Sequence, residues 1–493
     1  MKKLMISTVV LLGLIIVGLV VAIAMIDLNQ YKPKIEQAVK DASGYDLKIN
    51  GDISTSFSPI GVSVTDVSVA VPKKKAFVSF KSFDVALELI PLLKQKVKVN
   101  YIVLSNLDLM IEKMKNGKFN FDIASKKETV SKTTKKPVST TQKEPTKLPL
   151  VNVTEVRLEN ANVTYIDNIS NAKANANNID VTINDISLDS TKEKLKSIAF
   201  KGNVSIEKIQ YNKYTITNTT LDFDLKDAIA NLNSMKYTIF GSLASAKARV
   251  DMSGKTPKVS FEELIPELKL ENFSKEVLEK DLLKGIVNST AKLSFVGNDE
   301  LSARKTLVGH VLLDGKKVGI KGYDLDKIVK SYNDLKSGDL KKSGASFLSS
   351  ALENTAKGKS AFDSLQGGTT AIEQLHVKID VSKKMANLSD VAIATLNNRV
   401  ALQGSINLVD ESLKGVKVAI LDKQGCAKYT QGIEGTLSAP TGKGTTSSKV
   451  SVEQVQEVIG MVSSFFGKSK KKAAAKTTDE KCKVFYNGVV KQP

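Results

Sequence analysis

The side chains able to do acid–base, nucleophilic or metal chemistry are few and far apart in this sequence. The chain of 493 residues has two histidines, His310 and His376, and two cysteines, Cys426 and Cys482. Their spacings match no zinc-binding pattern, and the sequence contains no nucleophile elbow, Walker loop or convincing dinucleotide fingerprint. Carboxylates are numerous, so a catalytic Asp/Glu pair stays open, but no pattern singles one out. We therefore expect a protein that is not an enzyme and that has no catalytic residue, bound metal or cofactor.

Apolar residues at every second position are the more informative pattern, because they could bind an apolar ligand. In a strand, this alternation places one face against apolar material and leaves the other in water. A sheet whose apolar face stayed open would form a groove for acyl chains, since each buried methylene contributes about 0.8 kcal/mol. The candidate lining residues of this groove are Ile49, Ile53, Val85, Leu87, Val181, Ile183, Leu221 and Phe223.

Strands are expected over most of the chain, and they must position these residues. Alternation runs through residues 62–111, a turn follows at Asn116-Gly117, and alternation resumes over residues 151–239. Residues 125–149 are rich in Ser, Thr, Lys and Pro and predict a disordered linker or a long mobile loop. The expected fold class is mainly β, with an N-terminal transmembrane helix, an elongated, curved and mostly antiparallel sheet with an apolar face or groove, and a few short amphipathic helices.

Short helices are expected where the apolar spacing changes from two residues to three or four. Ser274 is the expected N-cap of one helix, and Gly44 the C-terminal cap of another. Between two later strands, Asp314-Gly315 has the composition of a hairpin turn. The expected helices cover residues 35–42, 273–282, 324–335, 345–356 and 451–466.

An apolar-x-Gly-x-apolar motif recurs along the predicted strands. Glycine weakens a strand interior, so its repeated use predicts bends or bulges that curve the sheet. Chance is the alternative, because 30 glycines in a β-rich sequence produce some matches. The central glycines are Gly51, Gly202, Gly241, Gly309, Gly404 and Gly435.

The N-terminal segment predicts export. Residues 4–26 carry no charge and would form a helix about 35 Å long, enough to cross a hydrocarbon core of roughly 30 Å. Two lysines precede this run, so the positive-inside rule places the N-terminus in the cytoplasm and residues 27–493 on the other side of the membrane. A cleaved signal peptide is the alternative, since residues 22–24 have the small-x-small form of a cleavage site. Both readings export the chain.

A series of short motifs follows this segment in order. They are Asn29-Gln30-Tyr31-Lys32-Pro33-Lys34-Ile35, Ser43-Gly44-Tyr45-Asp46-Leu47-Lys48-Ile49, Gly51-Asp52-Ile53 and Pro59-Ile60-Gly61-Val62. In order and spacing this region resembles the opening of the AsmA-like proteins of Gram-negative envelopes. Ser43-Gly44-Tyr45 stands where that family usually has Thr-Gly-Arg, which leaves the turn glycine in place. Residues 312–325 and 362–408 resemble the C-terminal half of the same family.

The resemblance implies an inner-membrane-anchored, single-pass protein of outer-membrane biogenesis with its bulk in the periplasm. It implies phospholipid as the cargo, bound or moved between membranes, and envelope proteins as further partners. The alternatives are a periplasmic assembly factor that receives unfolded strands at sheet edges, or a scaffold whose faces are fully packed. The expected regions are a stub and anchor (1–26), an N-terminal AsmA-like helix and β region (27–124), a linker (125–149), a central β region (150–260), a C-terminal AsmA-like α+β region (261–440), and a tail with a linker and amphipathic helix (441–493).

Positive charge and the two cysteines complete the composition. The chain has 72 basic and 52 acidic residues, a net charge of +20. In an exported protein this charge favours anionic lipid head groups or cell-surface polymers over nucleic acid, and lysines on solvated strand faces are the simpler explanation. Cys426 and Cys482 are expected to form a disulfide in an exported chain, with two free thiols as the alternative.

Overall fold

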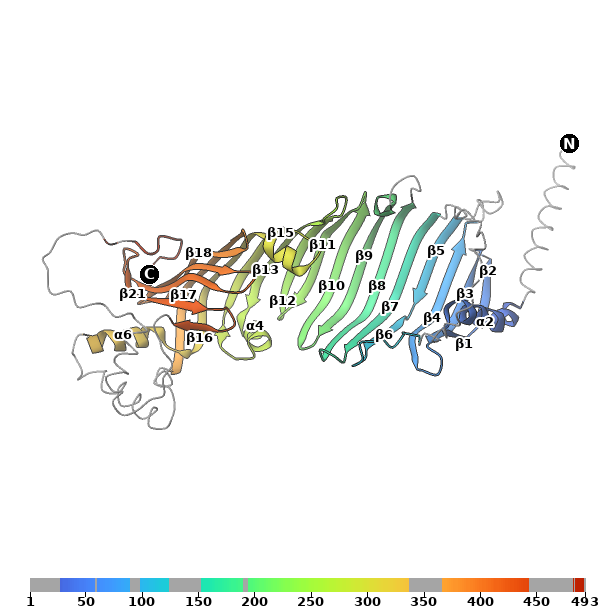
Figure 1. The fold of residues 1–493 in the computed structure, drawn as a ribbon, viewed down its shortest axis with the longest axis horizontal. Coiled ribbons are helices and arrows are strands. Elements are labelled where there is room, and N and C mark those ends of the chain that lie inside the picture. The colour runs from blue at the N-terminus through green and yellow to red at the C-terminus, as the bar shows by residue number, and fades with distance from the viewer. Residues whose placement is uncertain are drawn as a thin grey trace, which may run out of the picture. The chain divides into compact units, whose positions relative to one another are not determined.

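The computed structural model describes residues 27–57, 60–88, 98–123, 152–188, 194–336, 366–442, 482 and 484–491. The predicted anchor, the linker 125–149 and the predicted helices 345–356 and 451–466 lie outside these residues. Among the helices that are described, none is long and apolar enough to cross a membrane. The chain divides into two units, Met1–Met235 and Lys236–Pro493, each of which is built mainly from strands (Figure 1).

The first unit begins with a short helical segment, as the sequence predicts. A 3-10 turn, η1 (Leu28–Tyr31), leads into α2 (Lys32–Ser43), which ends at Gly44 with φ +79°. Glycine adopts this left-handed conformation without the steric cost that a Cβ brings. Side chains of the segment also satisfy strand amides: Asn29 Oδ1 accepts from the Ile53 N–H at 2.9 Å.

The sheet of the first unit is antiparallel except at one place. Strand β3 pairs with both β1 and β2, and pairing then continues through β4, β5 with β6, β7, β8, β9 and β10. Strand β7 runs parallel to β5 and β6, which lie end to end between it and β4. The strands are β1 (Asp46–Ile49), β2 (Ile53–Phe57), β3 (Ile60–Ala70), β4 (Ala76–Leu87), β5 (Lys98–Ser105), β6 (Asp108–Lys113), β7 (Asn152–Asp167), β8 (Ala172–Leu188), β9 (Ile198–Tyr211) and β10 (Tyr214–Lys226), with a turn η2 (Lys194–Ser197) before β9.

A line of left-handed Asn and Asp residues crosses this sheet. Asp66, Asn106 and Asn160 have φ between +47° and +54°. The residues that precede these three, Thr65, Ser105 and Glu159, lie at one level of the sheet. Thr65 pairs with Ser82 on β4, Ser82 pairs with Ser105, and Ser105 pairs with Glu159. Asn and Asp tolerate this conformation better than other non-glycine residues, because their short side chains bond locally.

The same line continues into the later strands. Asn178 and Asn218 also have positive φ, and each precedes a residue paired with Ile206. The side chain of Asp180 accepts from the Asn160 N–H at 2.8 Å, so a polar side chain satisfies an amide at the irregularity. At this level the apolar alternation slips by one residue in each strand, and we call this line the Asn line.

Fewer of the motif glycines lie at bends or bulges of the strands than the sequence predicts. Gly404 lies at a register shift between β19 and β20, as expected for a bulge. Gly51 lies between β1 and β2, and Gly241 lies with Phe240 in the turn that follows β11 (Ile229–Ile239). In the first unit several irregular positions inside strands belong instead to the Asn line, and other register shifts lie at Val69/Ala70, Ala86/Leu87 and Asn184/Ser187, so this part of the glycine prediction was wrong.

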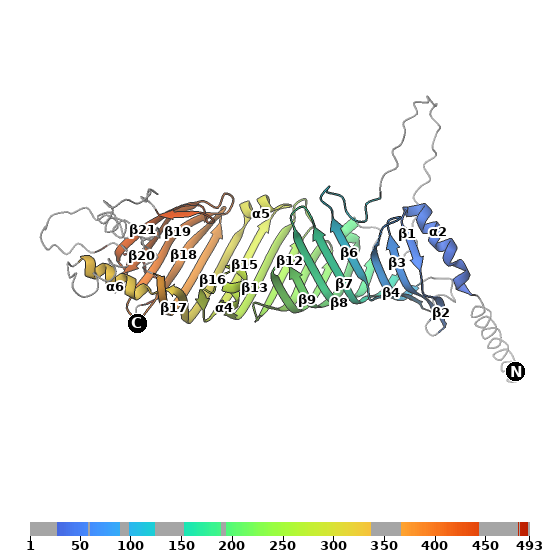
Figure 2. The same cartoon turned by 90° about the horizontal axis from the view of Figure 1, so that it is seen from below.

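The second unit is an antiparallel series in which the described neighbours pair in chain order. The exception is the two-residue β14, which pairs with β16 and lies end to end with β15 along it. Figure 2 shows α6 running beside the strands of this unit. Its elements are β12 (Ser242–Asp251), β13 (Lys258–Lys269), α4 (Leu270–Val277), β14 (Leu283–Lys284), β15 (Ile286–Val296), α5 (Glu300–Thr306), β16 (Val308–Tyr323), α6 (Leu325–Lys336), β17 (Gln366–Ser382), β18 (Met385–Ala394), β19 (Arg399–Asn407), β20 (Leu413–Leu421), β21 (Ala427–Gly435) and β22 (Pro440–Gly442).

Two local predictions in this unit were wrong. Asp314-Gly315 is not a turn, because β16 continues through it and Asp314 Oδ1 lies 2.6 Å from Nδ1 of His376 on β17. Ser274 is not an N-cap: it lies inside α4, and its hydroxyl accepts from the Leu282 N–H at 3.0 Å beyond the helix end. In both cases a contact with a later segment decides the local structure.

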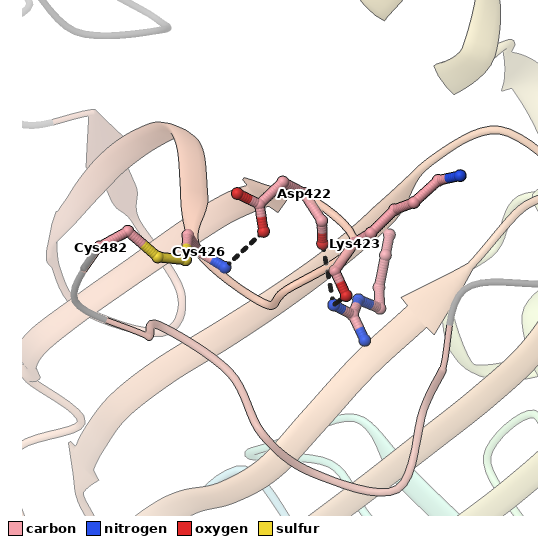
Figure 3. The surroundings of a disulfide bond; sticks show 5 residues. Asp422, Lys423, Cys426 and Cys482 are labelled. Carbon is pink, nitrogen blue, oxygen red and sulfur yellow. Dashed lines mark hydrogen bonds between the residues drawn. A yellow bond between two sulfur atoms is a disulfide. The ribbon is translucent and has the colours of Figure 1, made fainter. Parts of the chain in front are cut away.

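The end of the chain lies across one face of the second unit. Figure 3 shows the disulfide that joins Cys426, just before β21, to Cys482, with Asp422 accepting from the Cys426 N–H at 2.8 Å. Beyond the disulfide, Tyr486 and Val490 pack in a buried cluster against small residues of the sheet. Those sheet residues are Ala392, Ala394, Ala401, Ala419 and Leu421.

Candidate functional site: the apolar face of the first unit

Two lines of apolar residues cross strands β3 to β10 in register on one face of the first unit. Each residue is paired with the next one in its line. One line consists of Val62, Val85, Ile102, Val156, Ile183, Gly202 and Phe223. The other consists of Val64, Phe83, Leu104, Leu158, Val181, Val204 and Leu221. We call these two lines the apolar face.

No residue of the apolar face is fully buried. Val62 and Phe83 expose 43% and 36% of their surface, and the others are partly exposed. A core position would be covered by a second layer, but no described helix or strand of the first unit covers these residues to that extent. Rows of partly exposed apolar side chains on one surface indicate a binding surface for apolar material.

The opposite face of the same strands is polar. Ser63, Asp84, Arg157, Thr182 and Asn203 follow one another in register there, with Val103 among them. Arg157 bonds to Glu155 at 2.8 Å and to Glu159 at 3.0 Å, and its guanidinium lies 5.7 Å from the centre of the Tyr101 ring. The sheet is therefore two-sided, with one mostly polar face, on which Val103 is buried, and one apolar face that no described element covers.

Gly202 keeps one of the apolar lines continuous. A Cβ at this position would lie 2.7 Å from Cζ of Phe223, so the absence of a side chain leaves room for that ring against the sheet. Phe200 meets the same ring edge to face, with 5.9 Å between the ring centres. The glycine motif at residue 202 therefore serves side-chain packing on the apolar face.

The predicted lining residues fall into two environments. Val85, Leu87, Val181, Ile183, Leu221 and Phe223 are partly exposed, and all except Leu87 lie in the two lines; Leu87 continues the face beside Ile60. Ile49 and Ile53 are only 8% and 7% exposed, in a cluster that also contains Val67 and is packed by Leu28 from the N-terminal segment. These two residues belong to a closed core at the end of the face.

Most of the apolar face was missing from the sequence prediction, although a signal for it exists. Strict alternation puts apolar residues at positions i and i+2, but in several strands the next apolar residue stands at i+3. The intervening pair contains the Asn or Asp of the Asn line in Val64–Val67, Leu104–Leu107 and Leu158–Ala161. Treating such a slip as a bulge joins both halves of each strand into one face.

One cluster of titratable groups in the second unit holds the tail to the sheet. His376 lies buried between Asp314 and Asp390, with Nε2 3.8 Å from Asp390 Oδ2. Tyr486 of the tail donates to Asp390 Oδ1 at 2.5 Å. Burial, together with this hydrogen bond, raises the pKa of Tyr486 to about 12. The cluster therefore fixes the tail to β18.

Comparison with known proteins gives one result. No curated protein and no solved structure matches the chain. The sequence model of the AsmA family matches residues 1–204 and again residues 187–360, which together cover more than half of the chain. The protein therefore belongs to the AsmA family.

Proposed function

We propose that this protein binds phospholipid by its acyl chains on the apolar face and moves it between the membranes of the envelope. The observation that carries the proposal is the pair of registered apolar lines whose residues all remain partly exposed. Membership of the AsmA family indicates an envelope protein of outer-membrane biogenesis, which gives such a surface a lipid environment.

The dimensions of the face suit an acyl chain. Each line crosses seven strand positions, and at a strand spacing of about 4.8 Å it extends roughly 29 Å. One acyl chain spans one leaflet, about 15 Å of a hydrocarbon core of roughly 30 Å. A chain laid along the lines therefore stays on apolar surface over its whole length, with about 0.8 kcal/mol gained for each methylene that is fully buried.

The remaining parts of the proposal concern location and partners. Residues 4–26 anchor the protein in the inner membrane, with the N-terminus in the cytoplasm and the bulk in the periplasm. The net charge of +20 favours anionic head groups at the membrane surface. The protein acts as a binding protein without catalysis, and envelope proteins are its further partners.

The exposure of the apolar face favours this function over the two alternatives. A scaffold with fully packed faces requires Val62 and Phe83 to be covered, whereas both are among the exposed large apolar residues. An assembly factor that receives strands at sheet edges does not need an apolar face. Neither alternative uses the two registered lines.

Lipid mass spectrometry tests the proposal with a matched pair of variants. Val181 lies on the apolar face, and its neighbour Thr182 lies on the polar face. We expect the purified full chain to carry phospholipid, Val181→Asp to carry much less, and Thr182→Asp to carry as much as the wild type, with all three equally folded by circular dichroism. A wild type without phospholipid, or equal loss in both variants, would overturn the proposal.

A further inference from the structure

Helix α6 is fixed on the second unit by its first turn. The carboxylate of Asp326 accepts from Thr395 Oγ1 and Asn398 Nδ2, both at 2.6 Å, and from Asn397 Nδ2 at 3.0 Å. These three donors belong to the turn between β18 and β19. Val329 of the same helix is only 4% exposed. The start of α6 is thus held at a fixed place relative to the sheet.

A cavity of about 350 Å³ lies between α6 and the sheet. Leu325 and Ile328 line it from the helix. From the sheet it is lined by one registered row, in which Ile393 pairs with Val400 and Val400 with Ile420. The volume falls in the range typical of ligand pockets, about 300 to 1,000 Å³.

This cavity is separate from the packed core of the same strands. The alternate residues, among them Ala392, Ala401 and Ala419, are at most 3% exposed and pack against the tail on the other face. Small residues there let the tail approach closely, whereas the larger Ile and Val on the α6 face leave a space that no described side chain fills. The space is partly open to solvent, so an apolar ligand can enter it from outside.

The lining defines the chemistry of that occupant. Among the residues that the structure describes, no charged side chain lines the cavity. The hydroxyl of Thr370 is already used, since it accepts from the Leu325 N–H at 3.0 Å and donates to the Tyr323 carbonyl at 2.8 Å. Burial also raises the pKa of the lining residue Tyr429, as expected for an apolar surrounding.

We propose that this cavity binds the end of one acyl chain. If a methylene takes roughly the volume of a water molecule, about 30 Å³, the cavity holds on the order of ten methylenes. This site goes beyond the proposed function, which places lipid on the apolar face of the first unit, and shares with it only the class of ligand. The chain can come from a free fatty acid or from a phospholipid.

Photo-crosslinking of the full chain tests this site. The probes are a fatty acid with a diazirine near its methyl end and phosphatidylglycerol carrying the same chain, and crosslinked peptides are identified by mass spectrometry. We expect labelling of the peptides that contain Ile393, Val400 or Ile420. The probe that labels them identifies the source of the chain.

Two variants fill the cavity from opposite sides, and one is a control. Ile328→Trp fills it from the helix and Val400→Phe from the sheet, whereas Lys327→Trp places the same ring on the exposed side of α6. We expect labelling of the second unit to fall at least tenfold in both filling variants and to stay unchanged in the control.

The first unit provides the independent reference. Val181→Asp should remove labelling of β8 to β10 while the cavity is still labelled, so failure of the proposed function is distinguished from failure of this one. Wild-type protein labelled only in the first unit would overturn the cavity site. So would labelling of the second unit that persists in both filling variants.

Discussion

Substituting aspartate for each of the two residues that pair with Val64, in separate variants, distinguishes an open apolar face from a closed core. Ile53 on β2 and Phe83 on β4 both pair with Val64, yet they are 7% and 36% exposed. Ile53→Asp removes about 1.5–3 kcal/mol of apolar burial and places a carboxylate where water does not reach, which adds several kcal/mol. Since a domain is stable by only about 5–15 kcal/mol, this variant should unfold the first unit or nearly so.

Phe83→Asp should behave differently. Its side chain already reaches solvent, so the carboxylate stays hydrated and the loss is limited to partial apolar burial, about 2 kcal/mol or less. We expect urea denaturation followed by circular dichroism to show a small shift for Phe83→Asp and a large one for Ile53→Asp, while Phe83→Asp also loses bound phospholipid. Equal destabilisation by the two variants would refute the open face, because it would mean that Phe83 is as enclosed as Ile53.

Four further predictions concern other parts of the chain. In urea denaturation, Asn160→Val should lower the free energy of unfolding by about 1–2 kcal/mol and Asn160→Gly by much less. Residue 160 has φ +54°, a left-handed conformation that glycine adopts freely and a side chain with a Cβ adopts only at a steric cost. Because the pKa of Tyr486 is raised in the folded protein, its contribution to stability is complete below the pKa of the unfolded state, near 10, and is lost as the pH rises towards about 12. The tail should therefore become protease-sensitive over that interval, and this pH dependence should be weaker in Tyr486→Phe. Unfolded but unreduced protein should show no free thiol, and Cys482→Ser should lose about 4 kcal/mol of stability for a loop of 56 residues; labelling of both cysteines would contradict the bridge. A C-terminal reporter active only outside the cytoplasm should function and the protein should resist carbonate extraction, whereas release of a shortened soluble form would indicate signal-peptide cleavage.

The sequence predicts those features of the fold that depend on nearby residues. The helix ending at Gly44 and the helix after Tyr323 are confirmed, because caps and apolar spacing are local signals. The mainly β, largely antiparallel fold follows from alternation, which each strand carries in its own residues. The family assignment is also confirmed, since its motifs lie in order along the chain.

Features that depend on distant partners could not be predicted in this way. Asp314-Gly315 has a turn composition, but His376, far along the chain, binds Asp314 and keeps the strand extended. The burial of Ile53 depends on the packing of Leu28 against its cluster, whereas Phe83 lies outside that cluster and is exposed, although both positions carry apolar residues. Alternation identifies which residues share a face, and only the tertiary fold decides which part of that face is covered.

The parallel pairing of β7 has a consequence for the time course of folding. Neighbours such as β9 and β10 pair through a short turn at Tyr211 and Tyr214, so they can associate as soon as both are synthesised. Ser105, in contrast, pairs with Glu159, across the whole predicted linker. Closing such a long loop is entropically costly and slow compared with forming a hairpin.

Until β7 arrives, β5 and β6 present an unpaired edge. Such edges associate readily with other extended chains, so the interval in which this edge is exposed is the period of greatest aggregation risk for the first unit. Since the chain is synthesised from its N-terminus, this interval lasts as long as it takes to add the residues between Lys113 and Asn152. The segment between β6 and β7 therefore delays the folding of this unit, and shortening it should speed folding without changing the final sheet.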